Sequence, residues 1–160
     1  MTYDQFINVL RQHQTVHIKA IAFPESCAPQ MGEMLMGNSR TVLVVDDDAI
    51  VRHVYSRMLR QEGYETIEAS NGAEAVNLCQ QQAFAAVLMD VNMPVMDGLK
   101  ATKEIRRQAA ASLHMPIIGV TGYASTERAK CLAQGMDEVL DKPVSPETLF
   151  TTLQQAIQTT

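Results

Sequence analysis

The sequence has no run of basic residues, no long apolar stretch and no pair of closely spaced cysteines. Its net charge is −5, so it lacks the basic surface that nonspecific nucleic-acid binding requires. No apolar stretch approaches the roughly 20 residues of a membrane span, and the amino terminus lacks a basic segment followed by an apolar core. Cys27, Cys79 and Cys131 are far apart, which favours a reduced compartment without disulfides or a cysteine metal site. We therefore expect a cytoplasmic protein that binds neither nucleic acid nor membrane.

Beyond residue 40 the sequence alternates between short apolar runs and helix-length segments. A hydrophobic content of 46% is enough for one core in 160 residues. The pattern predicts strands at 42–45, 65–69, 85–90, 117–121 and 138–141, and helices at 49–61, 73–82, 99–107, 125–133 and 146–158. The first helix is expected to bury Ile50, Val54, Met58 and Leu59, and the last to bury Leu149, Phe150, Leu153 and Ile157. Such alternation is typical of an α/β protein with a parallel sheet and helices on both faces.

The composition of the strands predicts their order. The first, third and fourth strands are almost wholly apolar, as central strands covered on both faces are. The second and fifth carry charged residues and are expected at the edges. With right-handed crossovers this assignment gives a doubly wound five-stranded sheet of order 2-1-3-4-5, whose topological switch point lies between strands one and three.

Residues 1–39 follow a different pattern. Apolar residues at helical spacing near the amino terminus predict a short amphipathic helix, and Pro24, Pro29, Gly32 and Gly37 indicate a linker. We expect an extension of unknown role at 1–39, followed by a single domain at 40–160. The extension is either a packing appendage or remnant of an upstream unit, or a helix for docking to a partner or for dimerisation.

Polar residues stand at the carboxyl ends of four predicted strands: Asp46 and Asp47, Asp90, Thr121, and Lys142. Clustered carboxylates repel one another unless a cation joins them, and an oxygen-only ligand set favours Mg²⁺, or Mn²⁺, over softer metals. Read singly, each residue has a plainer explanation as a helix cap, a turn residue or a surface charge. Their joint placement at one sheet edge favours a functional site, and phosphoryl transfer suits its chemistry.

Four motifs in order resemble the response-regulator receiver domain of two-component signalling. They are VLVVDDD at 42–48, LMDVNMPVMDG at 88–98, IIGVTGYA at 117–124 and LDKPV at 140–144. The resemblance spans about residues 41–158 and implies a flavodoxin-like fold. The wording of the second motif is similar to that of receivers found in or beside hybrid kinases and multistep phosphorelays.

The resemblance implies a role for each acidic residue. Asp90 would be the phosphoacceptor, which takes a phosphoryl group from a phosphohistidine of a histidine kinase or histidine phosphotransfer protein. Asp47, Asp90 and the backbone carbonyl of Asn92 would bind Mg²⁺ directly, and Asp46 would do so through water. Asp48 is expected to cap the following helix. The chain would catalyse its own phosphorylation and slow dephosphorylation rather than turn over a substrate.

The resemblance also assigns Lys142 and Thr121 to the phosphoryl group. Lys142 would pair with Asp90 and then with phosphoryl oxygens, to which Thr121 would donate its hydroxyl; Pro143 suits a cis peptide there. Phosphorylation would be signalled to a downstream effector protein through the fourth helix, fifth strand and fifth helix. Many receivers carry an aromatic residue three positions before the lysine, whereas this sequence has Val139. Tyr123, with Asn92, is predicted to screen the acyl phosphate from water.

Two other function classes keep the same fold. A binding module with a vestigial site would work unphosphorylated, but the intact set of acids, Thr121 and Lys142 argues against it. A hydrolase of small phosphorylated molecules would use Asp90 as a nucleophile, yet it would normally carry another acid where this sequence has Asn92. No DNA-binding segment is evident after the last helix, so we expect signalling through protein contacts.

Overall fold

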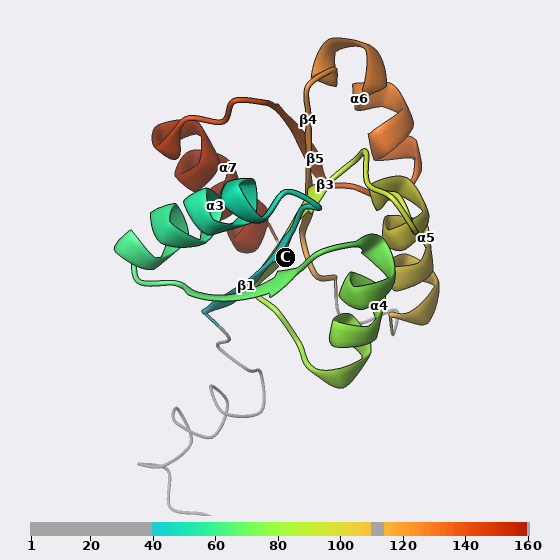
Figure 1. Ribbon diagram of the computed structural model, residues 1–160, viewed down its shortest axis with the longest axis horizontal. Coiled ribbons are helices and arrows are strands. Elements are labelled where there is room, and N and C mark those ends of the chain that lie inside the picture. Colours follow the sequence, from blue (N-terminus) through green and yellow to red (C-terminus); the bar gives the residue numbers. More distant parts are fainter. Residues whose placement is uncertain (1–39, 110–113, 160) are drawn as a thin grey trace, which may run out of the picture. The chain divides into compact units, whose positions relative to one another are not determined.

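In the part of the chain that the structure describes, five parallel strands form one sheet with helices on both faces, in the order β2-β1-β3-β4-β5 (Figure 1). The computed structural model describes residues 40–109 and 114–159. Its elements are β1 (Thr41–Val45), α3 (Ala49–Gln61), β2 (Glu65–Ala69), α4 (Gly72–Gln81), β3 (Ala86–Asp90), α5 (Gly98–Gln108), β4 (Ile117–Thr121), α6 (Ala124–Ala133), β5 (Glu138–Asp141) and α7 (Pro146–Gln158). The predicted fold class and strand order are confirmed, and the predicted ends agree within one residue. The expected helix and linker at 1–39 lie outside the described residues.

Each central strand supplies side chains to two separate cores, because successive strand residues point to opposite faces. In β1, Val42 and Val44 pack with α3 and α7, whereas Leu43 and Val45 pack with α4, α5 and α6. Figure 1 shows the same division, with α3 and α7 on one side of the sheet and the other three helices on the opposite side. This double coverage explains why β1, β3 and β4 are almost continuously apolar.

The predicted buried face of α3 is wrong at two positions. Ile50 and Val54 are 75% and 42% exposed, whereas Tyr55, Ser56 and Leu59 are buried. The face against the sheet is rotated by about one residue from the apolar pattern. Ser56 is tolerated inside because its hydroxyl donates to Glu68 Oε1 on β2 at 2.8 Å. The face of α7 is confirmed at Leu149 and Leu153, while Phe150 and Ile157 are half-buried.

Two helix starts fix the loops that follow β1 and β3. Asp48 caps α3 as predicted, because its side chain accepts from the backbone N–H groups of Ile50 and Val51. Asp97 caps α5 in the same way, at 2.8 Å from the Lys100 nitrogen. At Gly98 a Cβ atom would lie 2.2 Å from the carbonyl oxygen of Asp90, so only glycine allows α5 to begin this close to β3. No helix in 40–109 or 114–159 has the length and apolar character of a membrane span.

Candidate functional site

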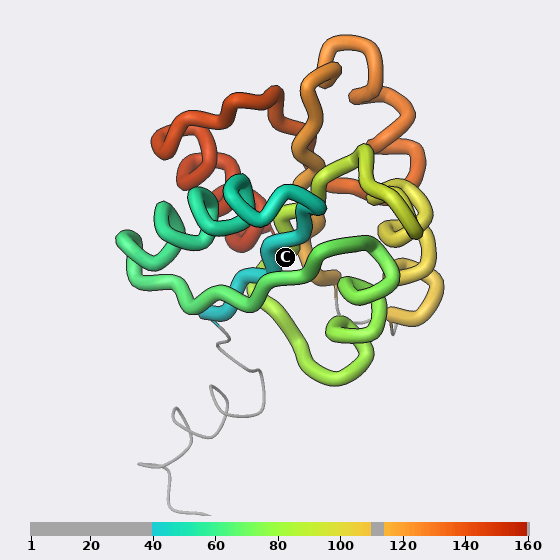
Figure 2. The backbone as a smooth tube through the Cα atoms, in the orientation of Figure 1, coloured from blue at the N-terminus to red at the C-terminus, as the bar shows by residue number. Residues whose placement is uncertain are grey.

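Three acidic side chains meet at the carboxyl edge of the sheet. Asp46 and Asp47 follow β1 directly, and Asp90 ends β3. Because β1 and β3 are paired in parallel, the chain leaves both strands toward the same edge (Figure 2), and carboxylate oxygens of the three residues lie within 4.8 Å of one another. Asp46 and Asp90 are only 2% and 6% exposed, whereas Asp47 is exposed. The structure therefore brings together the three acids that the sequence pattern assigns to one site.

Lys142 joins this group from the loop after β5. Its Nζ atom lies 2.6 Å from Asp46 Oδ2 and 3.0 Å from Asp90 Oδ1. The backbone N–H of Lys142 donates to the Thr121 carbonyl at 2.9 Å, and the Lys142–Pro143 peptide is cis, as predicted. The lysine thus bridges two carboxylates from separate strands.

Burial and charge pull the ionisation of this cluster in opposite directions. Burial raises the pKa of the Asp90 carboxyl above its ordinary value, and the nearby Asp46 and Asp47 charges raise it further against the opposing hydrogen bond from Lys142. Burial alone would lower the pKa of Lys142, but its hydrogen bonds to Asp46 and Asp90 outweigh burial, and the pKa is raised. The lysine is therefore charged, and ionisation of Asp90 is less favourable here than it would be in water.

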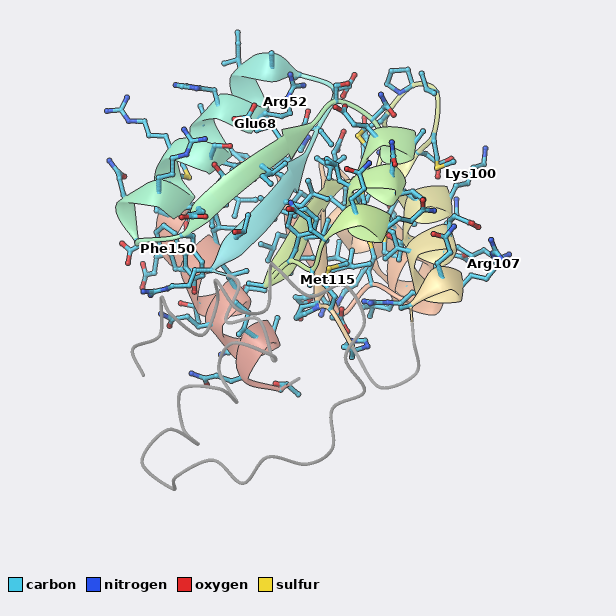
Figure 3. All side chains as sticks on the ribbon, turned by 90° about the horizontal axis from the view of Figure 1, so that it is seen from below. Arg52, Glu68, Lys100, Arg107, Met115 and Phe150 are labelled. Atoms are coloured by element: carbon cyan, nitrogen blue, oxygen red, sulfur yellow. The ribbon has the colours of Figure 1, made fainter. Side chains whose placement is uncertain are left out.

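Arg52 holds the backbone of the turn that carries Asp46 and Asp47, although the sequence pattern did not single it out. Its Nη1 atom donates to the carbonyl of Asp46 at 2.7 Å and to that of Asp47 at 3.3 Å. Figure 3 shows Arg52 of α3 beside Glu68 of β2, and the Nε–Oε2 distance is 3.5 Å. The sequence signal for this ion pair was Glu68, a charged residue in the partly buried strand β2, which indicates a cationic partner on the neighbouring helix.

Thr121 reaches the same sheet edge, but its hydroxyl is engaged elsewhere. The residue is 1% exposed, and its Oγ1 donates to Glu127 Oε2 of α6 at 2.5 Å while accepting from the Tyr123 nitrogen at 3.2 Å. Asn92 and Tyr123 are exposed on the loops after β3 and β4. Glu127 was not singled out from the sequence, where an acid in the first turn of a helix reads as a helix-dipole partner.

A family model described as the response regulator receiver domain matches residues 42–154 of this chain. The chain belongs to this family. The prediction drawn from the four motifs is thus confirmed, and the receiver domain accounts for most of the 160 residues.

Among known proteins, this receiver domain is similar to segments of long sensor kinases and to one short protein. It is 42% identical to the sensor histidine kinase RcsC of Salmonella typhimurium over 113 residues, which cover 70% of the chain but only 12% of the kinase. It is 34% identical to protein PilH of Pseudomonas aeruginosa over 112 residues, which cover 70% of the chain and 93% of PilH.

Solved structures of receiver domains match the fold. The receiver domain of a sensor histidine kinase from Pseudomonas aeruginosa, solved with a magnesium ion coordinated in its active-site cleft, has a TM-score of 0.68 and 37% identity, covering 74% of this chain and 97% of that one. Chemotaxis protein CheY4 of Vibrio cholerae has a TM-score of 0.67 and 38% identity, covering 72% and 97%.

Proposed function

We propose that the receiver domain accepts a phosphoryl group on Asp90 from a phosphohistidine. The observation that carries this proposal is the convergence of Asp46, Asp47, Asp90 and Lys142 from the carboxyl ends of three strands at one sheet edge. Asp90 is the acid of this group that ends the central strand β3, and it lies within 3.0 Å of a cationic donor. A buried carboxylate paired with a fixed ammonium suits attack on an anionic phosphoryl group.

The donor set fits a divalent cation with a preference for oxygen ligands. The three carboxylates lie close enough to share one ion, and neither histidine nor cysteine is among them. Asp47, Asp90 and the carbonyl of Asn92 would hold Mg²⁺, or Mn²⁺, with Asp46 acting through water. When bound, the ion would neutralise the acids and polarise the phosphoryl oxygens. Magnesium in the active-site cleft of the Pseudomonas aeruginosa receiver domain supports this assignment.

The chain's own groups would carry the transfer. An oxygen of Asp90 attacks phosphorus, the O–P bond forms as the P–N bond of the phosphohistidine breaks, and the bonding electron pair returns to the imidazole. The Lys142 ammonium then moves its hydrogen bond from Asp90 to a phosphoryl oxygen. Thr121 would donate to another. In self-dephosphorylation, water attacks phosphorus and the bond between phosphorus and the Asp90 oxygen breaks. Inorganic phosphate leaves and the Asp90 carboxylate is regenerated.

The partners follow from this chemistry. The donor is a histidine kinase or a histidine phosphotransfer protein, and the phosphorylated state is read by an effector protein at the face formed by α6, β5 and α7. The cytoplasm, where such donors would meet the domain, is the proposed location, and residues 1–39 would precede the receiver at 40–160 as an extension.

Tyr123 and Asn92 would set the lifetime of the acyl phosphate. The Tyr123 side chain is 67% exposed on the loop after β4, where it can screen Asp90 from water. We expect Tyr123→Ala to speed dephosphorylation by about a few-fold, within the range of one modest barrier change. Equal rates for the variant and the wild type would remove this role.

Locating the modified residue tests the proposal. The full chain is incubated with a small-molecule phosphodonor and Mg²⁺, and the modified peptide is identified by mass spectrometry. We expect modification at Asp90, none in Asp90→Asn or without divalent cation, and normal modification in Asp97→Asn, a control in the same loop whose new side chain can still cap α5. Modification elsewhere, or none in the wild type, would contradict the proposal and favour a module that works unphosphorylated.

A further inference from the structure

The hydroxyl of Thr121 is held by a carboxylate that lies outside the acidic cluster. Thr121 Oγ1 donates its hydrogen to Glu127 Oε2 at 2.5 Å, and Glu127 stands in the first turn of α6. Hydrogen bonds from a hydroxyl to an ionised carboxylate are among the stronger ones in proteins. Thr121 is 1% exposed, and Glu127 is half-buried, so water competes weakly for this contact.

A hydroxyl has one hydrogen to donate, and here it is already committed. Building on the phosphoacceptor role proposed for Asp90, we propose that Glu127 is a positioning residue that holds Thr121 away from the phosphoryl group until phosphorylation draws the hydroxyl across. The phosphoryl group supplies three strong acceptors and further negative charge. The switch is therefore an exchange of acceptors, in which Thr121 releases Glu127 and bonds to a phosphoryl oxygen.

The same turn of α6 is tied to the edge strand β5. Arg128, next to Glu127, pairs with Glu138 and donates through Nη1 to the carbonyl of Val139 at 3.1 Å. The backbone N–H of Ala124 donates to Asp141 Oδ1 at 3.1 Å. Two adjacent α6 residues thus connect the helix to Thr121 and to β5, so release of Glu127 changes how this turn is held.

Because position 139 is a valine, a contact other than an aromatic side chain there has to carry the signal from Thr121 to α6. Val139 is 4% exposed and has no aromatic ring that could turn between a buried and an exposed position. The Glu127 carboxylate, freed from Thr121, would be left near the new phosphoryl charge. Repulsion between them favours a shift of the first turn of α6, which lies in the proposed effector face.

Binding of fluoroberyllate, which mimics a phosphoryl group on a carboxylate, tests the exchange. Its affinity for the full chain is measured in Mg²⁺ by calorimetry for the wild type, Glu127→Ala and Glu127→Gln. We expect Glu127→Ala to bind roughly tenfold more tightly and Glu127→Gln to lie between, because a charge-assisted bond no longer has to be broken. Glu147→Gln is the control, since it removes an exposed acid from the first turn of α7 and should bind like the wild type.

A double-mutant cycle separates hydrogen bonding from simple repulsion. In a Thr121→Ala background there is no Thr121–Glu127 hydrogen bond to break, so only the gain from relieved repulsion remains, and the effect of Glu127→Ala should fall to about threefold or less. An equal gain in both backgrounds would overturn the proposal and assign the effect to charge alone. An unchanged affinity in folded Glu127→Ala, checked by circular dichroism, would overturn it as well. Absence of fluoroberyllate binding to the wild type would instead count against the phosphoacceptor role of Asp90.

Discussion

Two polar clusters lie at opposite edges of the same sheet, and they balance their charges differently. At the carboxyl edge, Lys142 is the cationic side chain paired with Asp46 and Asp90, and Asp47 adds a third carboxylate within 4.8 Å. Burial and mutual repulsion raise the pKa of the Asp90 carboxyl there. The carboxyl edge therefore concentrates negative charge that the paired lysine only partly offsets.

At the amino edge, each group of the second cluster has a matched partner. Arg106 of α5 donates to the carbonyls of Gly135 and Met115 at 2.8 and 2.6 Å, and its Nη2 lies 2.7 Å from Asp137 Oδ2. The same Asp137 oxygen accepts from the Ile117 nitrogen at 2.7 Å. One cation, one anion and the backbone groups around them satisfy one another across three elements.

The difference separates a polar cluster that stabilises the fold from one that we propose serves phosphoryl transfer. Both clusters contain groups that burial would penalise if they stood alone. The amino-edge cluster removes that penalty with its own residues, whereas the carboxyl-edge cluster keeps like charges together where a cation and a phosphoryl group are proposed to bind. We therefore expect the free energy of unfolding to fall when a partner is removed from the amino-edge cluster, and to rise when one of the like charges is removed from the carboxyl-edge cluster.

The largest effect is expected at the amino edge. Asp137→Ala should lower the free energy of unfolding by about 2 kcal/mol, because the Arg106 guanidinium and the buried Ile117 N–H each lose their carboxylate partner. Urea denaturation measures this loss. His114→Ala, which removes an exposed partner of the same aspartate, should cost no more than about 0.5 kcal/mol. If Asp47→Ala, measured without divalent cations, were as destabilising as Asp137→Ala, the contrast between the two edges would be lost.

A smaller effect of opposite sign is expected at the carboxyl edge. Without divalent cations at neutral pH, Asp90→Asn should raise the free energy of unfolding by about 1 kcal/mol, since an amide can still accept from Lys142 and carries no charge to repel its neighbours.

The pH dependence gives this prediction its sign. Because the pKa of Asp90 is raised in the folded state, the folded chain holds that proton more tightly than the unfolded chain does. The stability due to protonated Asp90 is complete below the ordinary pKa of an aspartate and is lost as the pH rises through the raised value. The advantage of Asp90→Asn should therefore vanish in acid and appear as the pH rises. An advantage that is the same at every pH would contradict this account.

The smallest effect concerns strain in the loop after β3. Val95 has φ = 68°, which is a strained value for a β-branched residue, and it is 87% exposed. Among the described residues, it is the one non-glycine with positive φ. Val95→Asn should raise the melting temperature, by an amount equivalent to roughly 0.5 to 1 kcal/mol, because asparagine tolerates this conformation. The melting temperature of Val95→Ala should lie between those of the wild type and Val95→Asn. A lower melting temperature for Val95→Asn than for the wild type would argue against strain in this loop.

The parts of the site that follow from topology could be predicted from the sequence. Parallel strands bring their carboxyl ends to one edge, so Asp46, Asp90 and Lys142 had to converge once the strands were assigned. The cap at Asp48 was predictable for a local reason, since it depends only on the turn that it closes. Neither inference requires knowledge of which side chains touch.

The parts that depend on contacts between distant side chains could not be predicted. Ser56 lies inside α3's buried face because Glu68, twelve residues away, accepts its hydroxyl, and the apolar pattern of Ile50 and Val54 gave the opposite indication. The contact between Thr121 and Glu127 depends on the shape of the loop that joins them. Neither composition nor hydrophobic periodicity predicts which distant side chains form such contacts.

Titration with Mg²⁺ tests most directly whether the carboxyl-edge cluster is completed by a cation. Calorimetry on the full chain should detect one ion per chain. Asp47→Ala and Asp90→Asn should each weaken binding about tenfold or more, because each removes a charged ligand, while His114→Ala should bind like the wild type. Undiminished binding in both aspartate variants, or none in the wild type, would contradict the account.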